Sequence, residues 1–285
     1  MFIITLTSIP PRFHLLYRTL DSLKRQNVKI DKIELWLPRR YLRFPDFEVS
    51  NIVVPDGVDL KVTDKDIGPA TKVLPAALQH SGEDVDLLYC DDDKVFHRAW
   101  AESFLFSKSY YARQGLDKCA FAAVGVCIDR YKDFNSQVPD RERPSRQKPL
   151  LDWRYRLKKY RRIFLKHTDP DLGLARTRWF SGPGRVDIME GYGGVMIRPN
   201  FFKPSDQFIP NPLWRVDDIW LSGLLASRGI KVMSNFKARL PTPILSASNG
   251  LAEEVENGLE RYNLDCLAIQ YFQDNHSIWT ENGSN

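Results

Sequence analysis

Cysteine is scarce in this chain of 285 residues, and long apolar runs are absent. The four cysteines, Cys90, Cys119, Cys127 and Cys266, form no CxxC pair. The first three lie in apolar stretches typical of buried strands. This usage argues against a zinc site and indicates reduced thiols in a reducing compartment. No apolar stretch approaches the roughly 20 residues that a membrane-spanning helix requires.

The sequence also contains no internal repeat, no low-complexity tract and no basic leader. Residues 1–6 predict a strand directly and are followed by no cleavage site, so we expect no signal peptide. With 43% hydrophobic residues the chain can bury a sizeable core. We expect one domain over residues 1–285, with a basic insertion at 130–180 and a helical C-terminal tail at 246–285. The expected location is the cytoplasm, with peripheral contact at the inner face of the membrane.

The net charge of +5 is unevenly distributed. Residues 141–178 hold thirteen Lys or Arg against four Asp or Glu, a local net charge of +9, which leaves −4 for the rest of the chain. A basic field of this size indicates an anionic partner. Nucleic acid is not the expected partner, because no nucleic-acid-binding motif accompanies the charge.

Part of this basic region, residues 153–164, predicts an amphipathic helix. Its apolar side chains share one face at helical spacing: Trp153, Leu157, Tyr160 and Phe164. Aromatic residues among Lys and Arg fit an anionic membrane surface, and they also fit an anionic or lipid-linked glycan. Packing of the apolar stripe against the main domain is an equal alternative.

Strands and helices are predicted to alternate along the chain. The apolar patterns predict strands over residues 2–6, 33–37, 60–63, 85–90, 120–128 and 230–233, and a strand–turn–strand unit over 185–197. They predict helices over residues 13–26, 68–80, 98–113, 216–228 and 259–272. This alternation indicates an α/β fold with a mixed, mostly parallel sheet flanked by helices and carrying a basic helical insertion.

Three polar loops follow predicted strands: residues 7–12, 64–72 and 91–93. In sheets of this kind, ligands bind beyond the carboxyl ends of the strands. The last loop is three consecutive aspartates, whose like charges repel and are costly to desolvate. Mg²⁺ and Mn²⁺ prefer such oxygen ligands. A turn that caps the next helix would explain the trio equally well on its own, but the convergence of three loops favours a binding site.

Five segments in this order resemble those of nucleotide-sugar-dependent glycosyltransferases of the GT-A fold, of a bacterial type. The segments are residues 5–12, 66–72, 89–93, 191–194 and 216–220, and the resemblance covers residues 2–235. It implies a Rossmann-like sheet and the transfer of a hexose from a nucleotide sugar, with a UDP-sugar favoured. The implied acceptor is a hydroxyl of a glycan or lipid-linked glycan, as in polysaccharide biosynthesis, and the implied stereochemistry is inversion.

The resemblance also implies roles for individual residues. Asp91 and Asp93 match the DxD motif, in which Asp93 would bind Mn²⁺ or Mg²⁺ at the donor diphosphate and Asp91 would share the metal or contact the donor ribose or sugar. His276 is the only candidate for the late histidine ligand that some of these enzymes use, and a solvent-exposed tail histidine is its alternative. The implied donor-binding set comprises Thr7, Ser8, Arg12, Asp66, Lys72, Asp91, Asp92, Gly193 and Gly194. Alternatives are an exposed helix lysine for Lys72 and a hairpin turn for the glycines.

Asp217 and Asp218 resemble the acidic pair of inverting members of this family, in which the second acid deprotonates the acceptor. We therefore expect Asp218 to act as the base and Asp217 to support it. A helix N-terminus favours an ionised carboxylate, although a single aspartate there is also a common cap. The family pair is often Glu-Asp, and the shorter side chain at position 217 leaves the choice of base open. Expected acceptor contacts are Tyr192, Trp214 and Arg215, with a tryptophan of the core as an equal alternative for Trp214.

Two other classes of function compete with this one. Nucleotidyltransferases that make sugar nucleotides share the sheet and the metal-binding aspartates, but they usually carry an early glycine-rich loop, and residues 5–12 contain no glycine. A non-catalytic module that binds anions or membranes through residues 141–178 would tolerate replacement of the aspartates.

Overall fold

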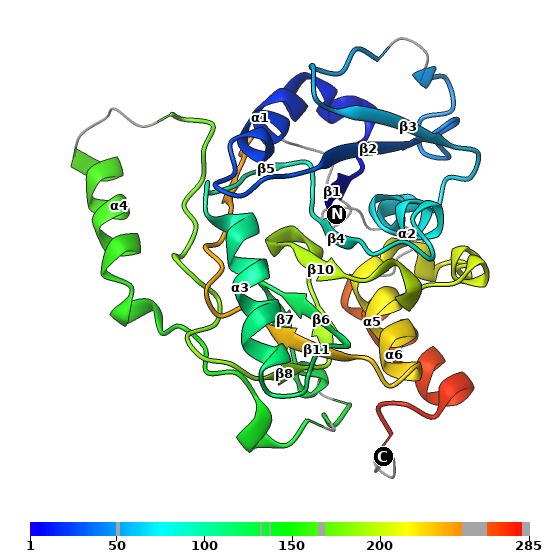
Figure 1. Cartoon of the computed structure of the whole chain (residues 1–285), viewed down its shortest axis with the longest axis vertical. Coiled ribbons are helices and arrows are strands. Elements are labelled where there is room, and N and C mark those ends of the chain that lie inside the picture. The colour runs from blue at the N-terminus through cyan, green and yellow to red at the C-terminus, as the bar shows by residue number, and fades with distance from the viewer. Residues whose placement is uncertain (50–51, 132, 137, 165–168, 247–260, 281–285) are drawn as a thin grey trace.

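A mixed eight-stranded sheet forms the centre of the structure (Figure 1), a computed structural model that describes the chain except for residues 50–51, 132, 137, 165–168, 247–260 and 281–285. The strand order is β3-β2-β1-β4-β10-β6-β11-β8. The first four of these are parallel: β1 (Phe2–Leu6), β2 (Lys32–Pro38), β3 (Asp59–Thr63) and β4 (Asp86–Tyr89). The mixed, mostly parallel α/β architecture predicted from the sequence is confirmed.

The second half of the sheet is entered through an antiparallel strand. Strand β10 (Val195–Ile197) runs antiparallel between β4 and β6 (Cys119–Ala122). Strand β11 (Lys231–Ser234) is parallel to β6, and β8 (Arg185–Val186) closes the edge antiparallel to β11. The carboxyl ends of β1, β2 and β4 therefore meet at one edge, beside the amino end of β10.

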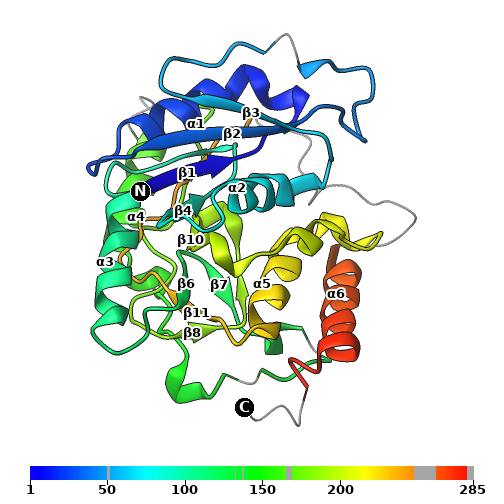
Figure 2. The same ribbon diagram turned by 45° about the vertical axis from the view of Figure 1, so that its right-hand side comes forward.

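Helices cover both faces of this sheet (Figures 1 and 2). On one face, α1 (Phe13–Lys24) and α3 (Trp100–Ala112) pack against side chains such as Ile4 and Leu88. On the other face, α2 (Leu74–Gln79), α5 (Asp217–Ser227) and α6 (Arg261–His276) pack against side chains such as Ile3 and Leu87. Neighbouring residues of a strand point to opposite faces, so these mostly apolar strands contribute side chains to two cores.

The helix predicted over 68–80 is divided into two pieces. Residues Gly68–Lys72 form a 3₁₀ turn, and α2 begins only at Leu74. Pro75 has no N–H to donate to the carbonyl four residues earlier, which prevents one regular helix through this point. The division matters because it sets the position of Lys72 at the junction.

Two strand predictions need correction. The apolar run 120–128 is not one strand: after β6 it forms β7 (Gly125–Val126), which pairs with β9 (Ile188–Met189) in a separate ladder. The segment 185–197 contains the predicted strands and the turn between them, but its first strand is divided into β8 and β9, and β8, β9 and β10 each pair with a different strand. Local apolar pattern does not determine which strand becomes the partner.

The C-terminal helix α6 belongs to the core. Its Phe272 is fully buried and lies 5.2 Å from Trp220 of α5, between ring centroids. Gly223 allows this approach, because a Cβ there would lie 2.3 Å from the Phe272 ring. Of the predicted tail, residues 247–260 and 281–285 lie outside the described part of the chain.

The basic insertion carries α4 (Trp153–Phe164), which stands at the periphery (Figure 1). It has no buried residue, so the alternative that its apolar stripe packs on the main domain is wrong. Strands β5 (Lys94–Val95) and β12 (Thr242–Pro243) pair with each other in a separate antiparallel ladder. All four cysteines are free, and no helix in the described ranges has the length and apolar character to cross a membrane.

Candidate functional site

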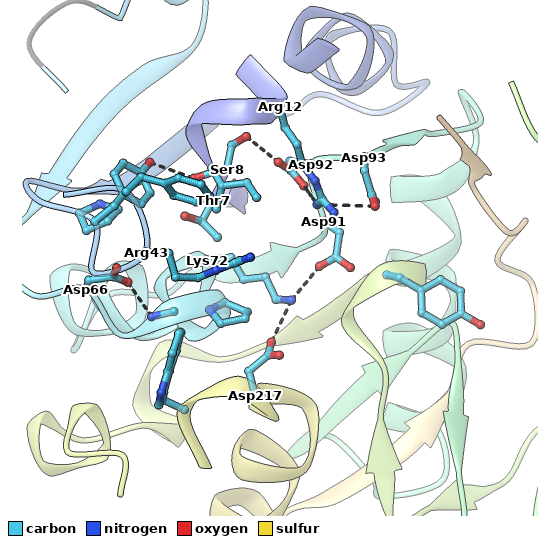
Figure 3. Close-up of a pocket in the computed structure, with 18 of the residues that line it drawn as sticks. Thr7, Ser8, Arg12, Arg43, Asp66, Lys72, Asp91, Asp92, Asp93 and Asp217 are labelled. Carbon is cyan, nitrogen blue, oxygen red and sulfur yellow. Dashed lines mark hydrogen bonds and ion pairs between the residues drawn. The ribbon is translucent and has the colours of Figure 1, made fainter. Parts of the chain in front are cut away.

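A cavity of about 320 Å³ opens where β1, β2 and β4 end. It brings together twelve of the residues predicted as site residues: Thr7, Ser8, Arg12, Asp66, Lys72, Asp91, Asp92, Asp93, Tyr192, Trp214, Asp217 and Asp218. Figure 3 shows the three consecutive aspartates on one side of Lys72, Arg43 and Asp66 on the other, and Asp217 below it. The predicted convergence of the three loops is therefore present in the fold.

One part of the cavity wall is apolar and aromatic. It is formed by Ile9, Pro38, Tyr41, Phe44 and Pro69, with the guanidinium of Arg43 beside them. The hydroxyl of Tyr41 donates a hydrogen bond to the Ser8 carbonyl at 2.9 Å, which fixes the ring. A wall of this kind offers flat surfaces on which a planar ring can stack.

Among the three aspartates, Asp92 connects two segments of the protein. Its carboxylate accepts hydrogen bonds from Ser8 Oγ at 2.5 Å and from Arg12 Nη1 at 2.8 Å. Its backbone carbonyl accepts another from Thr19 at 2.5 Å. Burial raises the pKa of Asp92, and its exposed fraction is only 6%. Asp92 therefore joins the loop after β1 to the end of β4, and its two oxygens are already engaged within the protein.

Asp66 likewise holds the backbone in place, on the side of the cavity opposite the three aspartates. Its two carboxylate oxygens accept the backbone N–H groups of Leu42 and Gly68, each at 2.8 Å. Gly68 has φ +61°, and a Cβ at this position would lie 2.4 Å from the Trp214 ring. Asp66 thus fixes the cavity wall at the turn where only glycine fits.

Lys72 is the electrostatic centre of the cavity. Its Nζ lies 2.7 Å from Asp91 Oδ1 and 2.9 Å from Asp217 Oδ2, and the side chain is 5% exposed. Burial lowers the pKa of Lys72, but Asp217, Asp91 and Asp218 together raise it well above its ordinary value. Burial likewise raises the pKa of Asp91, and the ammonium of Lys72 outweighs it and holds that pKa low. Lys72 and Asp91 are therefore both charged at neutral pH.

Asp218 differs from its neighbour Asp217. Burial, and then the charge of Asp217, raise the pKa of Asp218 well above its ordinary value. Its Oδ1 accepts the backbone N–H of Gly191 at 2.9 Å. A Cβ at position 191 would lie 2.8 Å from Lys72 Nζ and 3.3 Å from Asp218 Oδ1, so glycine is needed for this approach. A carboxyl with a raised pKa is well matched to accepting a proton.

Acidic groups outnumber basic groups in the cavity lining, which favours binding of a cation. Six carboxylates line it, at Asp66, Asp91, Asp92, Asp93, Asp217 and Asp218, against four basic groups, at Arg12, Arg43, Lys72 and Arg261. Asp93 Oδ2 lies 3.6 Å from Arg12 Nη1, and Asp93 Oδ1 lies 2.8 Å from Lys94 Nζ. No group of three or more His, Cys, Asp or Glu in the described ranges is arranged to hold a metal ion. Mg²⁺ commonly takes one or two carboxylates and fills its other positions with phosphate and water, and Asp91 and Asp93 are the carboxylates of this cavity that would supply them.

Four predicted site residues lie outside the cavity lining. A Cβ on Gly193 would lie 2.5 Å from Val124, and one on Gly194 would lie 2.3 Å from the Trp100 ring. The absence of side chains at the two glycines therefore serves packing against the core, and neither lines the cavity with the other residues predicted to bind the donor. Arg215 is buried with its guanidinium 5.2 Å from the Trp214 ring.

His276 lies at the far end of α6. Fifteen residues separate it along the helix from Arg261, which lines the cavity, and at 1.5 Å per residue this is roughly 22 Å. Its ring packs 5.3 Å from that of Phe272. The prediction of His276 as a third metal ligand beside Asp91 and Asp93 is therefore wrong.

Several cavity residues were missed by the sequence prediction. Tyr41, Arg43 and Phe44 follow β2, and the rule that sites form beyond strand ends would have identified their loop. Gly191, which does not line the cavity but donates a hydrogen bond to Asp218, belongs to a segment that was recognised, but Gly193 and Gly194 were chosen instead. Arg261, which lies 3.4 Å from Asp265, carries no motif that could have revealed it.

Comparison with known proteins gives no family assignment. No protein-family model and no curated protein matches the chain. Residues 1–349 of TarS from S. aureus are 12% identical, with a TM-score of 0.40 over 84% of this chain and 59% of that one. The same fragment in complex with UDP is 11% identical, with a TM-score of 0.39 over the same shares of the two chains. HddC from Yersinia pseudotuberculosis is 14% identical, with a TM-score of 0.32 over 70% of this chain and 77% of that one. The chain thus spans about three fifths of the TarS fragment, and TM-scores this low assign no function.

Proposed function

We propose that the chain is a metal-dependent glycosyltransferase that moves a sugar from a nucleotide sugar to a hydroxyl of a glycan or lipid-linked glycan, with inversion at the anomeric carbon. A UDP-sugar is the first donor to test. The observation that carries the proposal is one cavity that joins an aromatic wall, a buried lysine, a row of aspartates and a second carboxylate pair on α5.

The parts of a nucleotide-sugar donor match the aromatic, basic and acidic surfaces that follow one another along the cavity. A nucleobase would stack on Tyr41 and Phe44, and the diphosphate would lie near Lys72 and Arg12. A diphosphate adds negative charge to a cavity in which carboxylates already outnumber basic groups. A divalent cation held by Asp91 and Asp93 would offset that charge and stabilise the departing diphosphate when bound.

The carboxylates on α5 provide the acceptor chemistry. In the proposed step, Asp218 accepts the proton of the acceptor hydroxyl while the hydroxyl oxygen forms a bond to the anomeric carbon. The bond from that carbon to the diphosphate oxygen breaks, and the electron pair leaves with the nucleoside diphosphate. Asp217 is held by Lys72 at 2.9 Å and acts as a positioning residue, so Asp218 is the carboxyl left for proton transfer.

Donor binding is tested by a thermal-shift screen of UDP-, GDP-, CMP- and dTDP-sugars with and without Mn²⁺. A ligand that binds only the native state raises the melting temperature by mass action. We expect a rise with one nucleotide that requires the metal and disappears in Asp93→Ala. The control is Asp56→Ala, at an exposed aspartate outside the cavity, which should respond like the wild type. Nucleotide affinity that is unchanged in Asp93→Ala would refute the metal role.

Proton transfer is tested with Asp218→Asn, which preserves the shape of the side chain. We expect donor binding to persist and turnover, measured as nucleoside diphosphate released per acceptor glycosylated, to fall at least roughly a hundredfold. Full turnover in this variant would remove Asp218 from the mechanism. Formation of a nucleotide sugar with release of pyrophosphate from a nucleoside triphosphate would instead identify a nucleotidyltransferase.

A further inference from the structure

Helix α4 leaves its apolar side chains uncovered. Trp153 is 64% exposed, Leu157 53%, Tyr160 54% and Phe164 73%. Leu150 and Leu151, just before the helix, are 82% and 70% exposed. Large apolar side chains gathered on one exposed surface mark an interaction site in most proteins.

The apolar stripe of α4, formed by Trp153, Leu157, Tyr160 and Phe164, faces away from the rest of the molecule. At 3.6 residues per turn these four positions fall within an arc of roughly 60°. The half-buried positions of the helix, Tyr155 and Arg162, lie on the opposite side. Arg162 donates a hydrogen bond to the Leu172 carbonyl at 2.9 Å, which attaches that inner side to the following segment. Figure 1 shows the helix at the edge of the structure, consistent with this orientation.

The stripe is bordered by positive charge. Helix α4 contains six Arg or Lys and no acidic residue: Arg154, Arg156, Lys158, Lys159, Arg161 and Arg162. Pairs such as Arg154 and Lys158 are four residues apart, where like charges destabilise an isolated helix. Lys158, Arg161 and Arg162 also border a second cavity of about 300 Å³ on the inner side. An anionic surface applied to the stripe would relieve the repulsion among the outward-facing cations.

We propose that α4 docks on a bilayer that contains anionic phospholipids, with the apolar stripe in the headgroup region and the flanking cations at the phosphates. A helix with a strongly basic polar face and Trp, Phe and Leu on the other face has the composition of a helix that lies in a membrane interface. Nucleic acid would satisfy the charge but would leave Leu157 and the adjacent apolar surface in water. The inference does not depend on the chemistry of the cavity.

Vesicle co-sedimentation of the whole protein tests the proposal. We expect binding to POPC vesicles that contain 30% POPG, and much weaker binding to vesicles of POPC alone. Replacing Arg156 and Lys159 by Gln should weaken binding to the anionic vesicles by roughly fivefold for each charge removed. Raising the NaCl concentration to about 0.5 M should weaken it further, because salt screens exposed charges.

The apolar stripe is tested by the double variant Trp153→Ser and Phe164→Ser. Neither side chain is buried, so folding should be retained, and vesicle binding should fall at least roughly tenfold because interfacial binding scales with apolar area. The matched control is Tyr17→Ser with Leu267→Ser, which changes exposed apolar residues of α1 and α6 and should bind like the wild type. Asp218→Asn should also bind like the wild type, which separates this inference from the proposed enzyme function. Equal binding to neutral vesicles, undiminished binding of the Trp153 and Phe164 variant, or tighter binding to a labelled RNA duplex would overturn the proposal.

Discussion

Replacement of Lys72 by Met should destabilise the fold strongly. Met retains most of the volume of the lysine stem but removes the ammonium that lies between Asp91 and Asp217. Both carboxylates then lose their partner in a place where the lysine side chain is only 5% exposed. Removing one partner of a buried ion pair costs about 3–5 kcal/mol of unfolding free energy, because the remaining charge stays desolvated.

The loss should depend on pH in a defined way. The lowered pKa of Asp91 contributes stability that is present above its ordinary value of 3.8 and is lost as the pH falls through the folded value. The raised pKa of Lys72 contributes stability that is present below 10.5 and is lost as the pH rises through the folded value. The difference between wild type and Lys72→Met should therefore be largest between about pH 5 and 10 and shrink below about pH 4.

Urea unfolding followed by tryptophan fluorescence measures the effect. With an m-value of about 2–3 kcal/mol/M, a loss of 3–5 kcal/mol lowers the midpoint by roughly 1–2.5 M. The matched control is Lys108→Met, because Lys108 pairs with Asp86 at the opposite end of β4 at 2.6 Å but is 35% exposed. A pair this exposed is worth at most about 1 kcal/mol. A midpoint in Lys72→Met no lower than in Lys108→Met would refute the reasoning.

Two further changes test the geometry around Asp218. Gly191→Ala should lower the unfolding free energy by about 1–3 kcal/mol and weaken nucleotide binding, because the new Cβ would push Lys72 and Asp218 apart. The control is Gly182→Ala, whose Cβ makes ordinary contacts. Equal effects of the two substitutions would contradict the argument. The raised pKa of Asp218 stabilises the wild type below the ordinary pKa of 3.8, and this stability is lost as the pH rises through the pKa of the folded protein. Asp218→Asn has no such group, so its stability relative to the wild type should increase as the pH rises. Melting temperatures of both proteins between pH 5 and 8 measure this, and a constant difference would show that Asp218 titrates normally.

The alternation of apolar strands and helices was enough to predict the sheet and its layers. Strands β1, β2 and β4 are mostly apolar because both of their faces are covered, and such runs are visible in the sequence. The pairing of β7 with β9 was not predictable, because it depends on Gly125 meeting the backbone of Ile188 far along the chain. No local pattern contains that information.

The candidate site was predictable where it follows the rule that ligands bind beyond strand ends. Ser8, Lys72 and the three aspartates converge because their strands are parallel neighbours. The division of labour among Asp91, Asp92 and Asp93 was not predictable, since it depends on which side chain turns toward Arg12 and Ser8. Gly193 and Gly194 misled the prediction because the neighbours that require them, Val124 and Trp100, are distant in sequence.

The cavity is assembled from segments that extend from Thr7 to Arg261, on both sides of the antiparallel strand β10. A molecule in which α5 and α6 have detached from the sheet has lost Asp217, Asp218 and Arg261 from the cavity wall. Ligand occupancy therefore reports the fraction of molecules that have completed folding, including their C-terminal helix, and not merely those with a formed N-terminal sheet. Titration with a nucleotide ligand during refolding would time the docking of α5 and α6 on the sheet.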